Sequence, residues 1–134
     1  MKVYIAGKLG TKEEREELEK IDSLCKDLGI KTYLPHRDGG LLRSKKDIKK
    51  IFKSDITDNL PNCNLVIANL NGLHVGTGTA WELGFAYAKK IPCIGFKTDE
   101  SPLEGIDYLS PMILGSLKIV DSMNKLKNCI KALI

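Results

Sequence analysis

The chain has 134 residues, of which 43% are hydrophobic and 28% are charged, and its formal net charge is +4 at pH 7. This length and composition predict a single globular domain over residues 1–134 and exclude disordered, collagen-like and low-complexity proteins. No apolar run approaches the roughly 18 residues of a membrane-spanning helix and no signal peptide is recognisable, so we expect a cytoplasmic protein without a membrane partner.

Short apolar runs alternate with segments of helical periodicity along the chain. In chain order, we expect a strand at 3–6, a helix at 12–28, a strand at 30–34, a helix at 45–54, partial helix at 55–61, a strand at 65–68, a helix at 79–90, strands at 91–96 and 117–120, and a helix from 123 onwards. Strands separated by helices predict an α/β fold, here a Rossmann-like (flavodoxin-like) domain with a five-stranded parallel sheet and helices on both faces.

Local signals mark several of these boundaries. Thr11 and Glu14 have the spacing of a capping box, and Gly29 is placed to end the first long helix in a left-handed conformation. Ser44 and Ser122 are expected to cap later helices. A polar loop is expected from residue 36 to residue 43, after Pro35 has ended the second strand.

The cysteines and histidines do not form a metal-binding pattern. The four cysteines are isolated among apolar neighbours and the two histidines lack zinc-finger spacing: Cys25, Cys63, Cys93, Cys129, His36 and His74. We interpret the cysteines as small core residues of a protein in a reducing compartment, and we expect no metal.

A basic run between residues 43 and 53 holds six cations and a single acid, Asp47. With Ile48, Ile51 and Phe52 on the inward face of a helix, these cations form a solvated outer face. Nucleic-acid binding would require interleaved aromatic or arginine residues, so no nucleic-acid partner is expected.

Ligands of parallel α/β sheets bind beyond the carboxyl ends of the strands, which selects the loops at 7–11, 35–40, 69–79 and 97–110. The segment 76–84 is the densest signal, because its small residues allow close backbone approach and a helix N-terminus follows. A purely structural alternative is that Thr79 and Glu82 form a capping box.

Charged residues in two of these loops have both a structural and a functional interpretation. Lys8, Thr11 and Lys12 can bind a phosphate, or they can belong to a solvated loop and helix cap. Arg37 and Asp38 can pair with each other or contact a substrate.

Four motifs together resemble the nucleoside 2-deoxyribosyltransferase family, which includes the deoxynucleoside 5′-monophosphate N-glycosidases. They are YIAG at 4–7, PHRDG at 35–39, LVIANL at 65–70 and GTAWELGFA at 78–86. The resemblance covers nearly the whole chain. It implies that Glu82 attacks the anomeric carbon, that Tyr4 orients Glu82, and that Asp55, or alternatively Asp58, protonates or positions the base. A retaining pair of carboxyl groups lies roughly 5 Å apart.

The same resemblance implies a set of substrate-binding residues: Gly7, Lys8, Arg37, Asp38, Gly76, Gly78, Thr79, Ser110 and Met112. Two positions depart from the transferases. Gly76 stands where they usually have an aspartate, and Ser110 stands where they often have an asparagine. The monophosphate enzymes have a serine there, which helps to hold the 5′-phosphate of a substrate in the neighbouring subunit.

The resemblance therefore implies cleavage of an N-glycosidic bond, leading to base exchange in a transferase or, alternatively, to hydrolysis of a nucleoside 5′-monophosphate. A non-catalytic nucleotide-binding module is a third interpretation, motivated by Gly76. No metal or organic cofactor is implied. A homodimer or larger homo-oligomer with shared active sites is expected.

Overall fold

The computed structural model describes residues 1–99 and 109–134. Its strands are β1 (Lys2–Ala6), β2 (Lys31–Tyr33), β3 (Leu65–Asn69), β4 (Cys93–Phe96) and β5 (Lys118–Val120). Its α-helices are α1 (Lys12–Asp27), α2 (Pro35–Asp38), α3 (Asp47–Phe52), α4 (Thr77–Ala88), α5 (Pro111–Ser116) and α6 (Met123–Lys131). A π-helix η1 (Lys53–Asn59) and a 3₁₀ turn η2 (Leu60–Asn62) follow α3 directly. Most of the predicted ligand loop at 97–110 lies outside the described residues.

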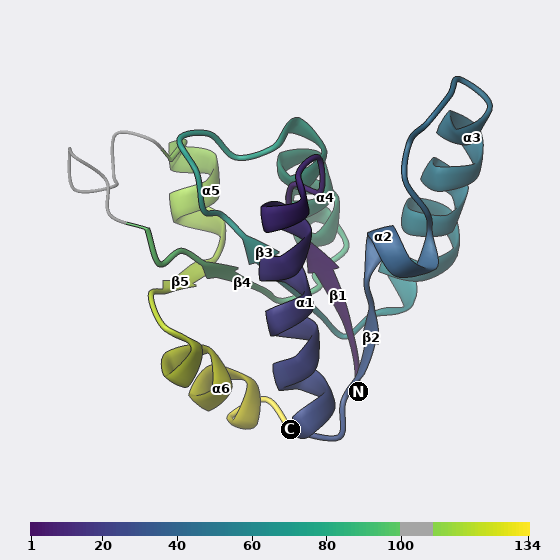
Figure 1. Cartoon of the computed structure of the whole chain (residues 1–134). Coiled ribbons are helices and arrows are strands. Elements are labelled where there is room, and N and C mark those ends of the chain that lie inside the picture. The colour runs from purple at the N-terminus through teal and green to yellow at the C-terminus, as the bar shows by residue number, and fades with distance from the viewer. Residues whose placement is uncertain (100–108) are drawn as a thin grey trace.

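The five strands form one parallel sheet in the order β2-β1-β3-β4-β5, which confirms the predicted fold class. In Figure 1, α1 and α6 lie on one face of the sheet and α4 and α5 lie on the other, while α3 projects beyond α2 at the β2 edge. The chain reverses its direction of winding between β1 and β3, and this switch point is where ligands of such sheets bind.

Alternation along β1 assigns its side chains to two separate cores. Val3 and Ile5 belong to the core under α1 and α6, whereas Tyr4 and Ala6 belong to the core under α4, and all four are fully buried. Since side chains on a strand alternate with a period of two, a tyrosine at position 4 faces α4. The position of Tyr4 in β1 therefore directs its hydroxyl toward α4, the helix that carries Glu82.

Several predicted boundaries are confirmed. Thr11 and Glu14 form a complete capping box at the start of α1, and Gly29 ends this segment with φ +73°. Ser122 accepts a hydrogen bond from the amide of Lys125 and caps α6.

Four local predictions are wrong. The helix α4 begins at Thr77 with Gly76 as its N-cap, so Thr79 and Glu82 do not form a capping box. Ser44 does not cap α3; instead the Asp47 carboxylate accepts hydrogen bonds from the amides of residues 43 and 44. The expected loop after Pro35 contains the short helix α2. The apolar side chains of α3 are not in the core, since Ile48 is 53% and Phe52 51% exposed.

Candidate active site

A pocket of about 780 Å³ opens beyond the carboxyl ends of β1 and β3. The β1–α1 loop, the segment 42–56 and the N-terminal half of α4 surround it. Of the residues predicted for the site, seven line this pocket: Gly7, Lys8, Asp55, Gly76, Gly78, Thr79 and Glu82. The tertiary structure thus brings together most of the predicted site from three separate parts of the chain.

Glu82 lies in the second turn of α4, and the hydroxyl of Tyr4 donates a short hydrogen bond to its Oε2 atom. Burial raises the pKa of Glu82 to about 7, and the negative charge of Asp55 acts in the same direction, while the hydrogen bond from Tyr4 opposes this shift. Burial also raises the pKa of Tyr4 far above its ordinary value, so Tyr4 remains a proton donor in this bond.

Asp55 belongs to η1 and faces the same pocket, whereas Asp58 does not line it. The Oδ1 atom of Asp55 accepts a hydrogen bond of 2.7 Å from the hydroxyl of Tyr33. Burial raises the pKa of Asp55, and the bond from Tyr33 opposes this shift. Asp58 is exposed and pairs with Lys53 at 2.8 Å. Of the two acids that the sequence leaves open, Asp55 is therefore the one at the pocket.

One wall of the pocket is apolar and was not predicted. It consists of Leu42, Ile48, Ile51, Phe52 and Trp81. The ring of Phe52 meets that of Trp81 edge-on, with centroids 5.8 Å apart, so α3 contacts α4 across the pocket. The helical spacing of Ile48, Ile51 and Phe52 could have predicted this wall, because an apolar helix face can contact a ligand as well as a core.

The lining of the pocket also includes a cation, Lys8. The ammonium group of Lys8 lies 3.6 Å from the carboxylate of Glu14, and the side chain of Lys8 remains one-third exposed. A Cβ atom at Gly76 would lie 2.8 Å from Cγ of Lys8, and one at Gly72 would lie 2.5 Å from its Nζ atom. These two glycines leave the space that the Lys8 side chain occupies.

Arg37 and Asp38 do not line the pocket. Arg37 pairs with Asp38 at 2.7 Å and with the buried Asp22 at 3.1 Å, so the structural interpretation of Arg37 and Asp38 is the one observed. Of the remaining phosphate candidates, Thr11 belongs to the α1 cap and Lys12 to an exposed pair with Glu16.

Ser110 and Met112 also lie outside the pocket of their own chain. Ser110 accepts a hydrogen bond from the amide of Met112 and thereby caps α5. The Met112 side chain is 76% exposed.

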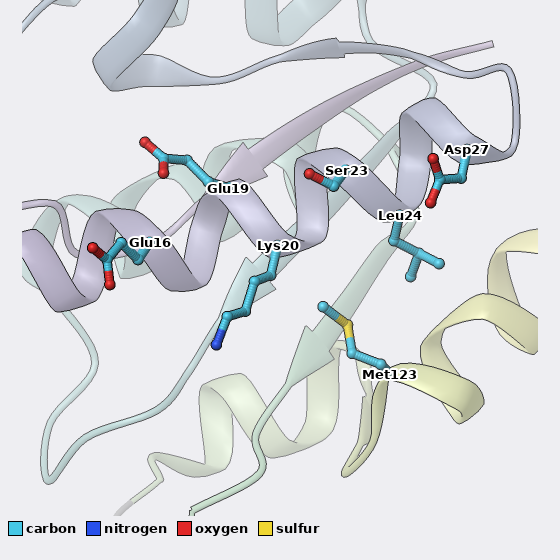
Figure 2. A pocket seen from close by; sticks show the side chains of 7 residues that line it. All are labelled: Glu16, Glu19, Lys20, Ser23, Leu24, Asp27 and Met123. Carbon is cyan, nitrogen blue, oxygen red and sulfur yellow. The ribbon is translucent and has the colours of Figure 1, made fainter.

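A second hollow, of about 490 Å³, lies between α1 and α6. Figure 2 shows Leu24 and Met123 facing each other across it, with Glu16, Glu19 and Asp27 spread along α1. None of the predicted site residues lines it, and its acids are distributed over separate turns. The first pocket, not this hollow, is therefore the candidate active site.

Within residues 1–99 and 109–134, no group of three potential ligands among His, Cys, Asp and Glu could hold a metal ion. In the same part of the chain, no helix is both long and apolar enough to cross a membrane.

Two carboxyl groups with raised pKa values at one pocket of a parallel α/β sheet are typical of a catalytic site. A family model described as nucleoside 2-deoxyribosyltransferase matches residues 3–129. The chain belongs to this family, as its motifs predicted.

Solved structures share the fold over nearly the whole chain. A conserved protein from Enterococcus faecalis V583 is 25% identical, with a TM-score of 0.76, and the match covers 100% of this chain and 99% of that one. A 2-deoxyribosyltransferase from Bacillus psychrosaccharolyticus is 22% identical, with a TM-score of 0.77 and coverages of 96% and 91%. A CMP N-glycosidase from Clostridium botulinum is 17% identical, with a TM-score of 0.60 and full coverage of both chains. No curated protein sequence matches the chain.

The raised pKa of Glu82 predicts a pH dependence of stability. Between its ordinary pKa of 4.5 and about 7, the unfolded chain releases this proton first, so the free energy of unfolding falls as pH rises. Glu82→Gln removes the buried charge while keeping an acceptor for Tyr4. We expect the variant to gain roughly 2–3 kcal/mol relative to wild type between pH 5 and pH 8 in urea unfolding. An equal pH slope in both proteins would mean that the carboxylate is fully solvated.

Proposed function

We propose that this protein cleaves the N-glycosidic bond of deoxynucleosides through a covalent glycosyl-Glu82 intermediate and transfers the sugar to a second base. The observation that carries the proposal is the pairing of Glu82 with Tyr4 at a pocket that also exposes Asp55. Membership of the family supports the same class of reaction.

In the first step, one oxygen of Glu82 attacks the anomeric carbon of the sugar. The hydroxyl of Tyr4 donates a hydrogen bond to Oε2, which leaves Oε1 free to attack. The bond from carbon to the base nitrogen breaks, and its electron pair goes to the base. Asp55 supplies a proton to the leaving base, so that the base departs without a negative charge.

In the second step, a nitrogen of an incoming base attacks the anomeric carbon and releases the Glu82 carboxylate. Asp55, now ionised, takes up the proton that the incoming base loses, which restores the enzyme. The wall that contains Ile48, Phe52 and Trp81 offers apolar and aromatic contact to a flat base. Water in place of the second base would give hydrolysis.

An alternative is a nucleoside 5′-monophosphate N-glycosidase, which releases free base and sugar 5-phosphate. The position of Lys8 favours it. An aspartate at position 76, as the transferases usually have, would collide with the Lys8 side chain. The observed position of Lys8 therefore requires glycine at position 76. A lysine ammonium group beside the N-terminus of α4 suits a phosphate.

We further propose a homodimer or larger homo-oligomer in which each subunit offers Ser110 and Met112 to a neighbour's pocket. Their location outside the pocket of their own chain supports this proposal. Half-exposed apolar residues on α4 support it too, since Trp81 is 52% and Tyr87 66% exposed. A cytoplasmic location stays a prediction, in keeping with four cysteines that form no disulfide.

A substrate panel tests the reaction. The protein is incubated with a 2′-deoxynucleoside or its 5′-monophosphate, with and without an acceptor base, and products are separated by chromatography. We expect base exchange, and a loss of at least about 10³-fold in Glu82→Gln because the nucleophile is gone. Glu16→Gln, an exposed site on α1, is the matched control. Base release without exchange from the monophosphate alone would select the hydrolase. Equal turnover in wild type and Glu82→Gln would mean that Glu82 is structural, and a wild type that turns over none of these substrates would leave a binding module.

Lys8→Met tests the recognition of phosphate. If Lys8 contacts a phosphate, the KM for a nucleoside 5′-monophosphate should rise by about 10-fold or more, while the KM for the nucleoside should hardly change. Lys12→Met is the control, because the side chain of Lys12 is 80% exposed and pairs with Glu16. Equal effects of Lys8→Met on both substrates would contradict a phosphate contact.

Sedimentation velocity at micromolar concentration tests the assembly. We expect a dimer or larger species, and we expect Met112→Asp to weaken it, because an exposed apolar side chain on α5 becomes charged. A wild-type protein that sediments as a monomer while fully active would contradict shared sites.

A further inference from the structure

Two tyrosines lie side by side beneath the pocket. Tyr4 in β1 is the register partner of Tyr33 in β2, so both side chains leave the sheet on the same face. Their rings stack with centroids 5.3 Å apart and an angle of 16° between planes. Each hydroxyl reaches a different carboxyl group of the pocket: Tyr4 donates to Glu82, and Tyr33 donates to Asp55.

We propose that Tyr33 is a positioning residue for the acid Asp55, in the same way that Tyr4 positions the nucleophile Glu82. The inference rests on the proposed function, which makes Asp55 the proton donor. It extends that function by naming a residue that neither the motifs nor the family resemblance singled out.

The hydrogen bonds of Tyr33 select one oxygen of Asp55. A phenol has a single proton, and Tyr33 donates it to Oδ1 of Asp55 over 2.7 Å. The hydroxyl of Ser54, 2.8 Å away, can then donate to the Tyr33 oxygen. Because Oδ1 already accepts a hydrogen bond, a proton on Asp55 is favoured on Oδ2. This arrangement presents the acidic proton from one defined atom.

Gly39 is a second observation in favour of this arrangement. A Cβ atom at this position would lie 2.5 Å from Oδ1 of Asp55 and 2.7 Å from the hydroxyl oxygen of Tyr33. The φ angle of Gly39 is −103°, which any residue can adopt, so the backbone does not require glycine there. What the position requires is space for the bond between Tyr33 and Asp55.

Two titratable groups from other elements interact electrostatically with Asp55. They are Glu82 from α4 and Tyr4 from β1; Tyr4 is fully buried, and the two carboxyl groups are partly buried. Removal of the Tyr33 hydroxyl should therefore raise the pKa of Asp55, since the lost bond stabilises the carboxylate.

Tyr33→Phe and its matched control Tyr4→Phe are compared on two substrates of the wild-type protein. With an ordinary purine deoxynucleoside, we expect Tyr33→Phe to lower kcat by about 10- to 100-fold and to change KM little. A 7-methylpurine deoxynucleoside needs no acid, because its base departs uncharged. Tyr33→Phe should therefore approach wild-type rates on it, whereas Tyr4→Phe should be slow on both. An equal loss on both substrates in Tyr33→Phe would overturn the assignment.

A titration tests the same contact without activity. The ¹³C carboxyl signal of Asp55, assigned with Asp55→Asn, should report a higher pKa in Tyr33→Phe than in wild type, and an unchanged pKa would overturn the assignment. Gly39→Ala should reproduce the shift, whereas Gly84→Ala, which meets no neighbouring atom within 4 Å, should not. Failure of the wild type to release any base would contradict the proposed function instead, and the titration distinguishes the two failures.

Discussion

The hydrogen bond between Tyr4 and Glu82 is the contact on which the rest of the site depends. It joins β1, an inner strand of the sheet, to α4 and places a carboxyl group where burial raises its pKa to about 7. A buried carboxylate is costly unless donors reach it, and a tyrosine that stays protonated is a durable donor. The fold thus tolerates an unfavourable charge at the pocket, which is typical of residues kept for chemistry.

The two faces of the sheet have different tasks. The face under α1 and α6 is packed with aliphatic side chains such as Ile5, Ile67 and Leu126. The opposite face carries Tyr4 and Tyr33 in a core that also contains aliphatic side chains such as Val66, Leu70 and Leu83. Since parallel strands place their carboxyl ends at the same edge, the hydroxyls of this second face reach the two acids, which lie on α4 and η1. One face supplies stability, and the other supplies the site together with part of the core.

The pocket combines walls of contrasting character. The helix α3 and the segment before it present exposed apolar side chains to the pocket. One of them, Phe52, contacts Trp81 of α4. Lys8 lies in space left by Gly72 and Gly76. A pocket lined by apolar side chains, a cation and two acids fits a ligand that has both an apolar part and polar groups.

The sequence by itself determined the alternation of strands and helices, the parallel sheet and the family, and it singled out Glu82 and Tyr4 as candidates, because these depend on local periodicity and on motifs contained in short segments. Only the tertiary structure placed Asp55 rather than Asp58 at the pocket, paired Arg37 with Asp38 and Asp22, and turned the apolar face of α3 toward the pocket. It also revealed Tyr33 through its register with Tyr4. The reason is physical: periodicity states that a helix has an apolar face, whereas long-range packing decides whether that face meets a core or a ligand, and which charges become neighbours.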